Sequence, residues 1–124
     1  MNLNQITVPV KDVAQSITFY EALGLKLIVK ALPHYARFEC PIGDATFSLH
    51  QSESEVKGEG VWVYFEVENV DESVHNLIQK GIVFEALPED KTWLWQEARL
   101  KNLDGNPIII YHAGENRKSP PWKI

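Results

Sequence analysis

The side chains that could carry out chemistry in this chain are few and widely spread. Cys40 is the only cysteine, so neither a disulfide framework nor a cysteine-rich zinc site is possible. No serine or cysteine has an identifiable base beside it, and no glycine-rich phosphate loop is present. Trp93 and Trp95, in contrast, alternate along a predicted strand, where two indole rings would share one face. This pattern favours binding of a planar or amphipathic organic ligand over nucleophilic catalysis.

Composition and charge narrow the class of protein further. The 124 residues are 44% hydrophobic with a net charge of -5, which predicts one soluble globular domain and disfavours a nucleic-acid partner. No apolar run approaches the length of a membrane span, and the first residues lack the basic-then-apolar order of a signal peptide. We therefore expect a cytoplasmic protein with no membrane association.

The elements that position these side chains come from an internal repeat. A shift of 57 positions places Ile6–Val13 over Val63–Val70, and it also aligns Gly24 with Gly81. Each copy begins with alternating apolar residues, which predict a strand, and continues with a helix-capping pair and one apolar stripe of a helix. The glycines stand where a left-handed helix C-cap is expected.

Three further strands are predicted after each strand–helix unit. They cover residues 25–31, 35–40 and 45–51 in the first half, and 83–86, 92–101 and 107–112 in the second. Turn-forming sequences separate them, at Pro33, Pro41–Asp44, Pro88–Asp90 and Asp104–Asn106. Module 1 then spans about residues 3–51 and module 2 about 61–112, with a polar linker over about 52–60 and an irregular tail over 113–124.

The predicted fold class is α+β, with two βαβββ modules that form a curved mixed sheet around a cleft and keep their helices outside. This duplication, with Ile6–Asp12 at its start and Asp104-Gly105-Asn106-Pro107 before the last strand, resembles the vicinal oxygen chelate superfamily. That group contains glyoxalase I, extradiol dioxygenases, fosfomycin resistance enzymes and bleomycin resistance proteins. The likeness covers roughly residues 3–112.

The resemblance implies four positions for a catalytic metal, because metal enzymes of the family hold a divalent ion with side chains from the first and last strand of each module. Those positions carry Gln5, Ser48, Trp62 and Ile109 here. An indole cannot bind a metal through a lone pair, an alkyl group has no donor, and a serine hydroxyl is a poor ligand. We therefore expect no metal and no cofactor. His50 could add one nitrogen to the Gln5 amide, which makes two ligands where three are usual.

Residue parity predicts which side chains would face the cleft. Starting from the two first-strand positions Gln5 and Trp62, the alternation gives Gln5, Thr7, Ser48, His50, Trp62, Tyr64, Glu66, Ile109 and Tyr111, and the two tryptophans Trp93 and Trp95 join them as an apolar wall. Which face of strand 92–101 points inward stays open. Sheet packing or a dimer contact is an equal alternative for Trp93 and Trp95, and a structural hydrogen bond is an alternative for His50.

Three functions follow from these residues. The first is a metal-free binding protein of the bleomycin resistance type, which takes an aromatic or amphipathic small molecule and forms a homodimer. The second is a glyoxalase- or dioxygenase-type enzyme with unusual metal ligands, Gln5 and His50. The third is a non-catalytic interaction scaffold in which Trp62 and Ile109 fill the former metal site.

Overall fold

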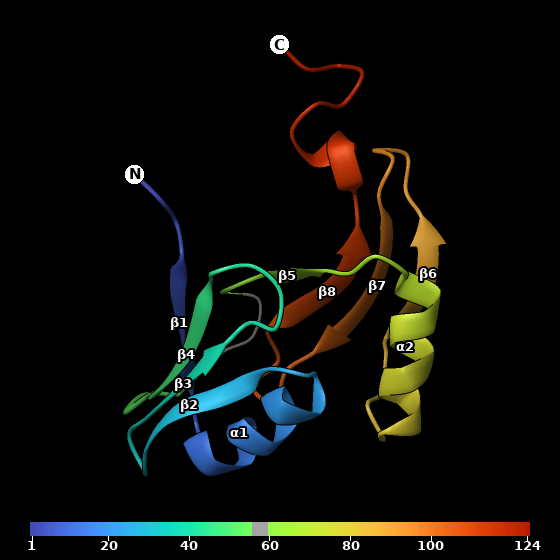
Figure 1. The fold of residues 1–124 in the computed structure, drawn as a ribbon. Coiled ribbons are helices and arrows are strands. Elements are labelled where there is room, and N and C mark those ends of the chain that lie inside the picture. The colour runs from blue at the N-terminus through green and yellow to red at the C-terminus, as the bar shows by residue number, and fades with distance from the viewer. Residues whose placement is uncertain (56–59) are drawn as a thin grey trace. The chain divides into compact units, whose positions relative to one another are not determined.

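The computed structural model describes residues 1–55 and 60–124, and within these ranges the strands form two four-stranded sheets (Figure 1). The chain divides into two compact units: unit 1 comprises residues 1–61 and 102–105, and unit 2 comprises residues 62–101 and 106–124. Each unit packs one α-helix against its own sheet, which confirms the predicted α+β fold with two βαβββ modules. The predicted linker over 52–60 includes residues 56–59, which lie outside the described residues. No described helix is long and apolar enough to cross a membrane.

Unit 1 places its helix against one face of a mixed sheet. Its elements are β1 (Gln5–Val10), α1 (Val13–Ala22), β2 (Lys26–Ala31), β3 (Tyr35–Glu39) and β4 (Thr46–Gln51). The strand order is β1-β4-β3-β2, with β1 parallel to β4. Tyr20 of α1 is fully buried, and its ring centroid lies 4.7 Å from that of Phe47 and 6.0 Å from that of Phe38. Since side chains alternate along a strand, the neighbours of Phe47 and Phe38 face away from α1.

Both helices begin and end as the sequence predicts. The Asp12 carboxylate accepts a hydrogen bond from the N–H of Gln15 (3.0 Å), and the Asn69 side chain accepts one from the N–H of Glu72 (3.0 Å). These bonds satisfy amide groups that have no partner within the first helical turn. Gly24 follows α1 with a φ of +103°, a conformation that favours glycine. The capping signals therefore fix where each helix sits relative to the strand before it.

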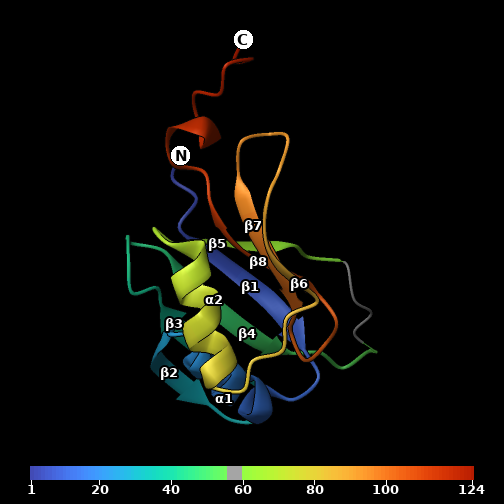
Figure 2. The same ribbon diagram turned by 90° about the vertical axis from the view of Figure 1, so that its right-hand side faces the viewer.

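Unit 2 repeats this arrangement. Its elements are β5 (Val63–Glu66), α2 (Val70–Gln79), β6 (Ala86–Asp90), β7 (Gln96–Lys101), β8 (Pro107–His112) and the 3-10 helix η1 (Gly114–Arg117). The strand order is β5-β8-β7-β6, with β5 parallel to β8. Val70 and Val74 of α2 pack with Ala98 of β7. Figure 2 shows α2 in yellow and the β6–β7 hairpin in orange, with the turn of the hairpin beyond the end of the helix.

The β6–β7 hairpin differs from its prediction. The strand expected over 83–86 lies at Ala86–Asp90, so the predicted turn at Pro88–Asp90 is wrong, and the strand expected over 92–101 begins only at Gln96. The chain instead turns at residues 91–94, where the N–H of Leu94 donates to the carbonyl of Lys91 (3.0 Å) and Leu94 has a φ of +68°. Pro88 fits in β6 because this is an edge strand with a register shift between Ala86 and Glu89, where a missing N–H is tolerated.

The turn between β7 and β8 belongs to unit 1. The Asn102 side-chain amide donates to the Tyr20 hydroxyl (3.2 Å), and the Asp104 carboxylate accepts from the N–H of Lys11 (2.9 Å). Burial and the charge of Asp104 raise the pKa of Tyr20 to about 12, against the opposing effect of the Asn102 hydrogen bond. The predicted turn is confirmed, since the N–H of Gly105 donates to the carbonyl of Asn102 (3.1 Å).

Candidate functional site

Two polar residues of the implied metal positions meet on the face of the unit 1 sheet opposite α1. The side-chain amide nitrogen of Gln5 donates to the Ser48 hydroxyl (2.7 Å), and the Thr46 hydroxyl donates to the amide oxygen of Gln5. Thr7 is paired with Ser48 across β1 and β4, just as Tyr64 is paired with Ile109 across β5 and β8. The two pairs are equivalent in the two modules, with a shift of 57 positions on the first strand (Thr7 to Tyr64) and 61 on the last (Ser48 to Ile109).

The alternative metal pair, Gln5 with His50, comes from two well-separated rows of the unit 1 sheet. In the β1–β4 register Gln5 lies opposite Thr46, whereas His50 lies opposite Pro9. His50 lies four positions after Thr46, which is about 13 Å along the strand. The Gln5 amide is hydrogen-bonded to Ser48 and Thr46, and the joint ligation by Gln5 and His50 stays a prediction.

In unit 2 the implied metal positions are occupied by side chains with no lone pair for an ion. Ile109 is buried with Tyr111, Ala113 and Trp95. The indole of Trp62 lies under a guanidinium, with Arg99 Cζ 4.6 Å from the ring centroid. Across residues 1–55 and 60–124, no group of three or more histidine, cysteine, aspartate or glutamate side chains is placed to hold a metal ion. The residues at the family's four positions therefore do not fit a divalent metal centre.

Two further residues lie on this face of the unit 1 sheet, and the alternation of side chains along β1 and β4 did not predict them. Tyr35 lies with its hydroxyl 2.7 Å from that of Ser48, and Arg37 Nε donates to the Tyr35 oxygen (2.9 Å). Both residues come from β3, two positions apart, so they share a face. The alternation of Tyr35, Arg37 and Glu39 with the apolar Ala36 and Phe38 is the sequence signal that could have found them. We call Thr7, Tyr35, Arg37 and Ser48 the polar face.

The environment of Tyr35 makes its phenol more acidic. Burial alone raises the pKa of a phenol, but the hydrogen bonds with Ser48 and Arg37 and the positive charge of Arg37 together hold the pKa of Tyr35 below its ordinary value. His50 lies opposite Tyr35 in the β3–β4 register and is exposed. With His34 and Pro9, His50 also lines a surface pocket of unit 1.

Three predicted site residues form an interlocked aromatic cluster in unit 2. The ring centroids of Trp95 and Tyr111 are 4.9 Å apart, those of Tyr64 and Tyr111 are 5.5 Å apart, and those of Tyr64 and Trp95 are 6.1 Å apart. These are the separations at which aromatic pairs attract each other. Ala98 packs against α2, so the cluster lies on the opposite side of the sheet. We call Trp62, Tyr64, Trp95 and Tyr111 the aromatic face.

The structure shows which side chains of β7 face the aromatic face. Glu97 and Arg99 alternate with Ala98, and Arg99 stacks on Trp62, so both point to the aromatic face. Trp93 lies in the hairpin turn, and its indole N–H donates to the Glu97 carboxylate (2.6 Å). Trp93 therefore does not belong to the strand alternation that includes Trp95. Its hydrogen bond joins it to Glu97, which lies on the aromatic face.

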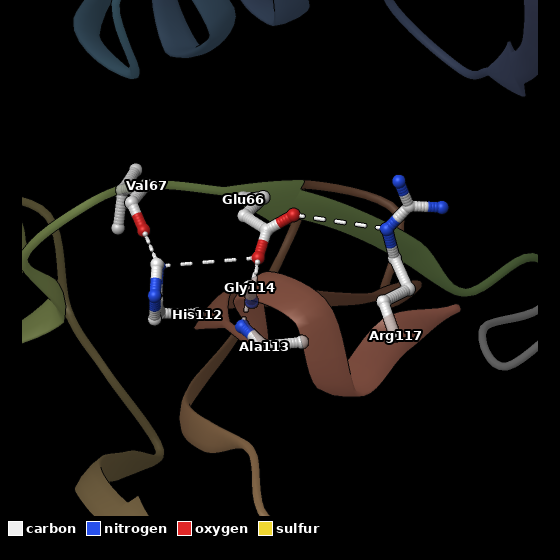
Figure 3. A network of polar contacts seen from close by, with 6 residues as sticks. All are labelled: Glu66, Val67, His112, Ala113, Gly114 and Arg117. Atoms are coloured by element: carbon white, nitrogen blue, oxygen red, sulfur yellow. Dashed lines mark hydrogen bonds and ion pairs between the residues drawn. The ribbon is translucent and has the colours of Figure 1, made fainter. Parts of the chain in front are cut away.

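Glu66, a predicted ligand contact, anchors the C-terminal segment (Figure 3). One carboxylate oxygen accepts hydrogen bonds from the backbone N–H groups of Ala113 (2.7 Å) and Gly114 (2.9 Å). The other oxygen lies 3.7 Å from Arg117 Nε, and His112 Nδ1 lies 3.9 Å from the carboxylate. The carboxylate thus joins the end of β5 to the start of η1.

The surroundings of Glu66 favour its ionised form. Partial burial opposes ionisation, but the two backbone donors and the charges of His112 and Arg117 hold the pKa of Glu66 below its ordinary value. Burial and the charge of Glu66 raise the pKa of the neighbouring Tyr111. His112 Nδ1 lies 2.8 Å from the carbonyl oxygen of Val67. A carbonyl only accepts, so this nitrogen carries a proton.

Comparison with known proteins agrees with the fold of two βαβββ modules. The model of the Glyoxalase/Bleomycin resistance protein/Dioxygenase superfamily matches residues 2–110. The uncharacterized protein YraH of Bacillus subtilis (strain 168) is 30% identical over 125 residues, which cover 90% of this chain and 98% of YraH.

Solved structures give the same fold at low identity. A lactoylglutathione lyase from Agrobacterium tumefaciens superposes with a TM-score of 0.75 at 16% identity, over 90% of this chain and 92% of that one. A bleomycin-binding protein complexed with bleomycin superposes with a TM-score of 0.71 at 16% identity, over 90% of this chain and 98% of that one. On the strength of the family match, the chain belongs to the glyoxalase/bleomycin resistance protein/dioxygenase superfamily.

Proposed function

We propose that this protein binds a planar aromatic or amphipathic small molecule without the help of a metal, through the aromatic face of unit 2. The observation that carries the proposal is the interlocked cluster of Tyr64, Trp95 and Tyr111 on the side of the sheet opposite α2. Tyr64 is 43% exposed, so part of this surface is free to stack against a ligand. Large rigid rings supply contact area at a low cost in side-chain entropy.

The contacts of Trp62 support the same function. Its ring is 48% exposed and is held by the guanidinium of Arg99, 4.6 Å from the ring centroid. This leaves one ring face to the cation and the remaining indole surface to a ligand. The residues at the four implied metal positions do not fit a metal, which supports binding rather than Lewis-acid catalysis. A bleomycin-binding protein with this fold gives a precedent for the class of ligand.

The experiment is isothermal titration calorimetry of the whole chain in EDTA. Metal-free bleomycin and the planar cation proflavine serve as probes. We expect one saturable site per chain, weakened about fivefold by Trp62→Ala, because one aromatic contact contributes about 1 kcal/mol. Trp122→Ala is the matched control, since Trp122 is an exposed tryptophan of the C-terminal tail. This control should leave the affinity unchanged.

Two other results would overturn the proposal. Binding or turnover that appears only after addition of Ni²⁺, Zn²⁺, Mn²⁺ or Fe²⁺ would favour a metal-dependent enzyme, the function of the lactoylglutathione lyase type. If neither probe binds with or without metal, and Trp62→Ala changes only the stability, the aromatic face would be part of an interaction scaffold.

We also propose that the protein is a homodimer. Trp93 and Leu94, in the turn of the β6–β7 hairpin, are each more than 40% exposed, and exposed aromatic groups are enriched at protein interfaces. Light scattering after size exclusion should give twice the chain mass of 14.2 kDa. A monomer at all concentrations that can be reached would contradict this assembly and leave ligand binding to be judged by calorimetry.

A further inference from the structure

The hydrogen bonds of the polar face in unit 1 have a direction that can be worked out from their donors. The Gln5 amide nitrogen lies 3.3 Å from the carbonyl oxygen of Ile6, which can only accept. The amide nitrogen of Gln5 therefore points towards the Ile6 carbonyl. The amide oxygen points towards Thr46 and accepts a hydrogen bond from its hydroxyl. The same nitrogen donates to Ser48 at 2.7 Å. The Ser48 hydroxyl oxygen thus accepts a hydrogen bond from Gln5.

The Ser48 hydroxyl must in turn donate a hydrogen bond to the Tyr35 oxygen. The side chain of Ser48 is fully buried, and a buried hydroxyl proton needs an acceptor. Among the described residues, the acceptor within hydrogen-bond distance is the Tyr35 oxygen, at 2.7 Å. Arg37 Nε donates to that oxygen as well, at 2.9 Å. A phenol oxygen has two lone pairs, so both are occupied.

It follows that the Tyr35 proton is not used inside the network. It is left to point away from Ser48 and Arg37, as a donor for an outside acceptor. Arg37 is exposed, and its terminal nitrogens carry further donors beyond the one bound to Tyr35. The Thr7 hydroxyl accepts from Gln5 at 3.2 Å, so its proton is also directed outward. The surface presents a set of donors.

The strand register brings these donors together. Thr7, Ser48 and Arg37 form one row across β1, β4 and β3. Neighbouring strands are about 4.8 Å apart, so Thr7 and Arg37 stand about 10 Å apart with the small Ser48 between them. Ser48 is buried beneath its contacts with Gln5 and Tyr35, and Tyr35 comes from the next row, which it shares with His50.

We propose that Thr7, Tyr35 and Arg37 bind an oxyanion group of a small molecule, a carboxylate or a phosphonate-like group, with the Tyr35 hydroxyl as a hydrogen-bond donor. The local charges agree. Arg37 is a cation without an ion pair among the described residues, and His50 adds no negative charge. The nearest carboxylate on the same face, Glu39, is paired with Lys26 at 3.2 Å. Bidentate binding of carboxylate and phosphate groups is characteristic of arginine.

The lowered pKa of Tyr35 is consistent with this role, since a more acidic phenol is a stronger donor to an anion. A bound anion should in turn disfavour the phenolate and raise the pKa of Tyr35. The site consists of residues of unit 1 alone. It does not depend on the aromatic face of unit 2, so either proposal can fail without the other.

The test is NMR of the whole chain with ¹³Cζ-labelled tyrosine, at constant ionic strength in chloride. Inorganic phosphate, methylphosphonate and acetate are the probes, and Tyr35→Phe assigns the Tyr35 signal among the four tyrosines. We expect saturable shifts at Tyr35 and at the Arg37 Nε–H, and a higher Tyr35 titration midpoint with the probe bound. Arg37→Gln should weaken binding at least tenfold, as expected for loss of a charged hydrogen bond.

Arg117→Gln is the matched control, because it removes the same charge from unit 2 and should leave the affinity unchanged. A preference for phosphate and methylphosphonate over acetate would identify a tetrahedral oxyanion, and the reverse a carboxylate. The proposal is overturned if Arg37→Gln binds all three probes as tightly as the wild type. It is equally overturned if the Tyr35 signal does not respond to tens of millimolar of any probe.

Discussion

Glu66→Gln gives the sharpest test of how the C-terminal segment is held. The substitution keeps the shape of the side chain and one oxygen acceptor but removes the charge. Two backbone N–H groups, of Ala113 and Gly114, donate to this carboxylate at 2.7 and 2.9 Å. A hydrogen bond to a charged group contributes about 1 kcal/mol more than a neutral one. The contacts with Arg117 and His112, at 3.7 and 3.9 Å and partly exposed, add little.

The expected loss for Glu66→Gln is therefore about 1–2 kcal/mol of unfolding free energy at neutral pH. This corresponds to a fall in Tm of roughly 3–8 °C for a chain of this size. Urea and thermal unfolding followed by circular dichroism measure the loss, and amide exchange at Ala113 and Gly114 should become faster. Glu68→Gln is the control, because Glu68 is an exposed carboxylate two residues further along.

The pH dependence distinguishes a charge effect from a packing effect. The pKa of Glu66 is lower in the folded protein than its ordinary value of 4.5. Its stabilisation is therefore complete above that ordinary value and is lost as the pH falls through the lowered folded value. The gap between wild type and Glu66→Gln should shrink in acid. An equal gap at neutral pH and at about pH 3, or an equal loss in Glu68→Gln, would refute the reasoning.

Three further substitutions test the fold. Tyr20→Phe removes the acceptor of the Asn102 amide and should cost about 1–2 kcal/mol in urea unfolding; an unchanged midpoint would contradict that role. Gly24→Ala should cost about 1–2 kcal/mol through backbone strain alone, because φ is +103° and no atom lies within 4 Å of the added Cβ; a gain in stability would contradict it. Asn69→Ala should cost about 1 kcal/mol by loss of the bond to the Glu72 N–H, and Asn69→Ser should restore most of it.

Local signals explain why most of the fold could be predicted. Alternation along β1 and β5 fixes which side chains face the helix, and this needs no knowledge of the partner strand. The caps at Asp12 and Asn69 use a bond to a residue three positions on, which is visible in the sequence. The repeat then transfers each assignment from one module to the other. The pairing of Tyr64 with Ile109 follows from that of Thr7 with Ser48.

The features that the sequence could not predict depend on contacts between distant segments. Pro88 and the acidic residues after it have the composition of a turn, yet they form an edge strand because pairing with β7 overrides that preference. Tyr35 and Arg37 become notable only when the β3–β4 register places them beside Ser48. The Glu66 carboxylate binds backbone N–H groups, which every residue but proline has, so its partners leave no sequence signature.

The turn between β7 and β8 means that unit 1 can form all its contacts only after residues 102–105 have been synthesised. The last strand of unit 1 ends at Gln51, but the Tyr20 hydroxyl and the Lys11 amide meet their partners on residues 102–105. During synthesis, the Tyr20 hydroxyl and the Lys11 amide therefore lack these hydrogen-bond partners until most of the second module has left the ribosome. A gene cut at the linker would thus encode a first fragment that lacks the hydrogen bonds of Tyr20 and Lys11 with residues 102–105. The repeat marks how the sequence duplicated, and it does not mark where the protein can be divided.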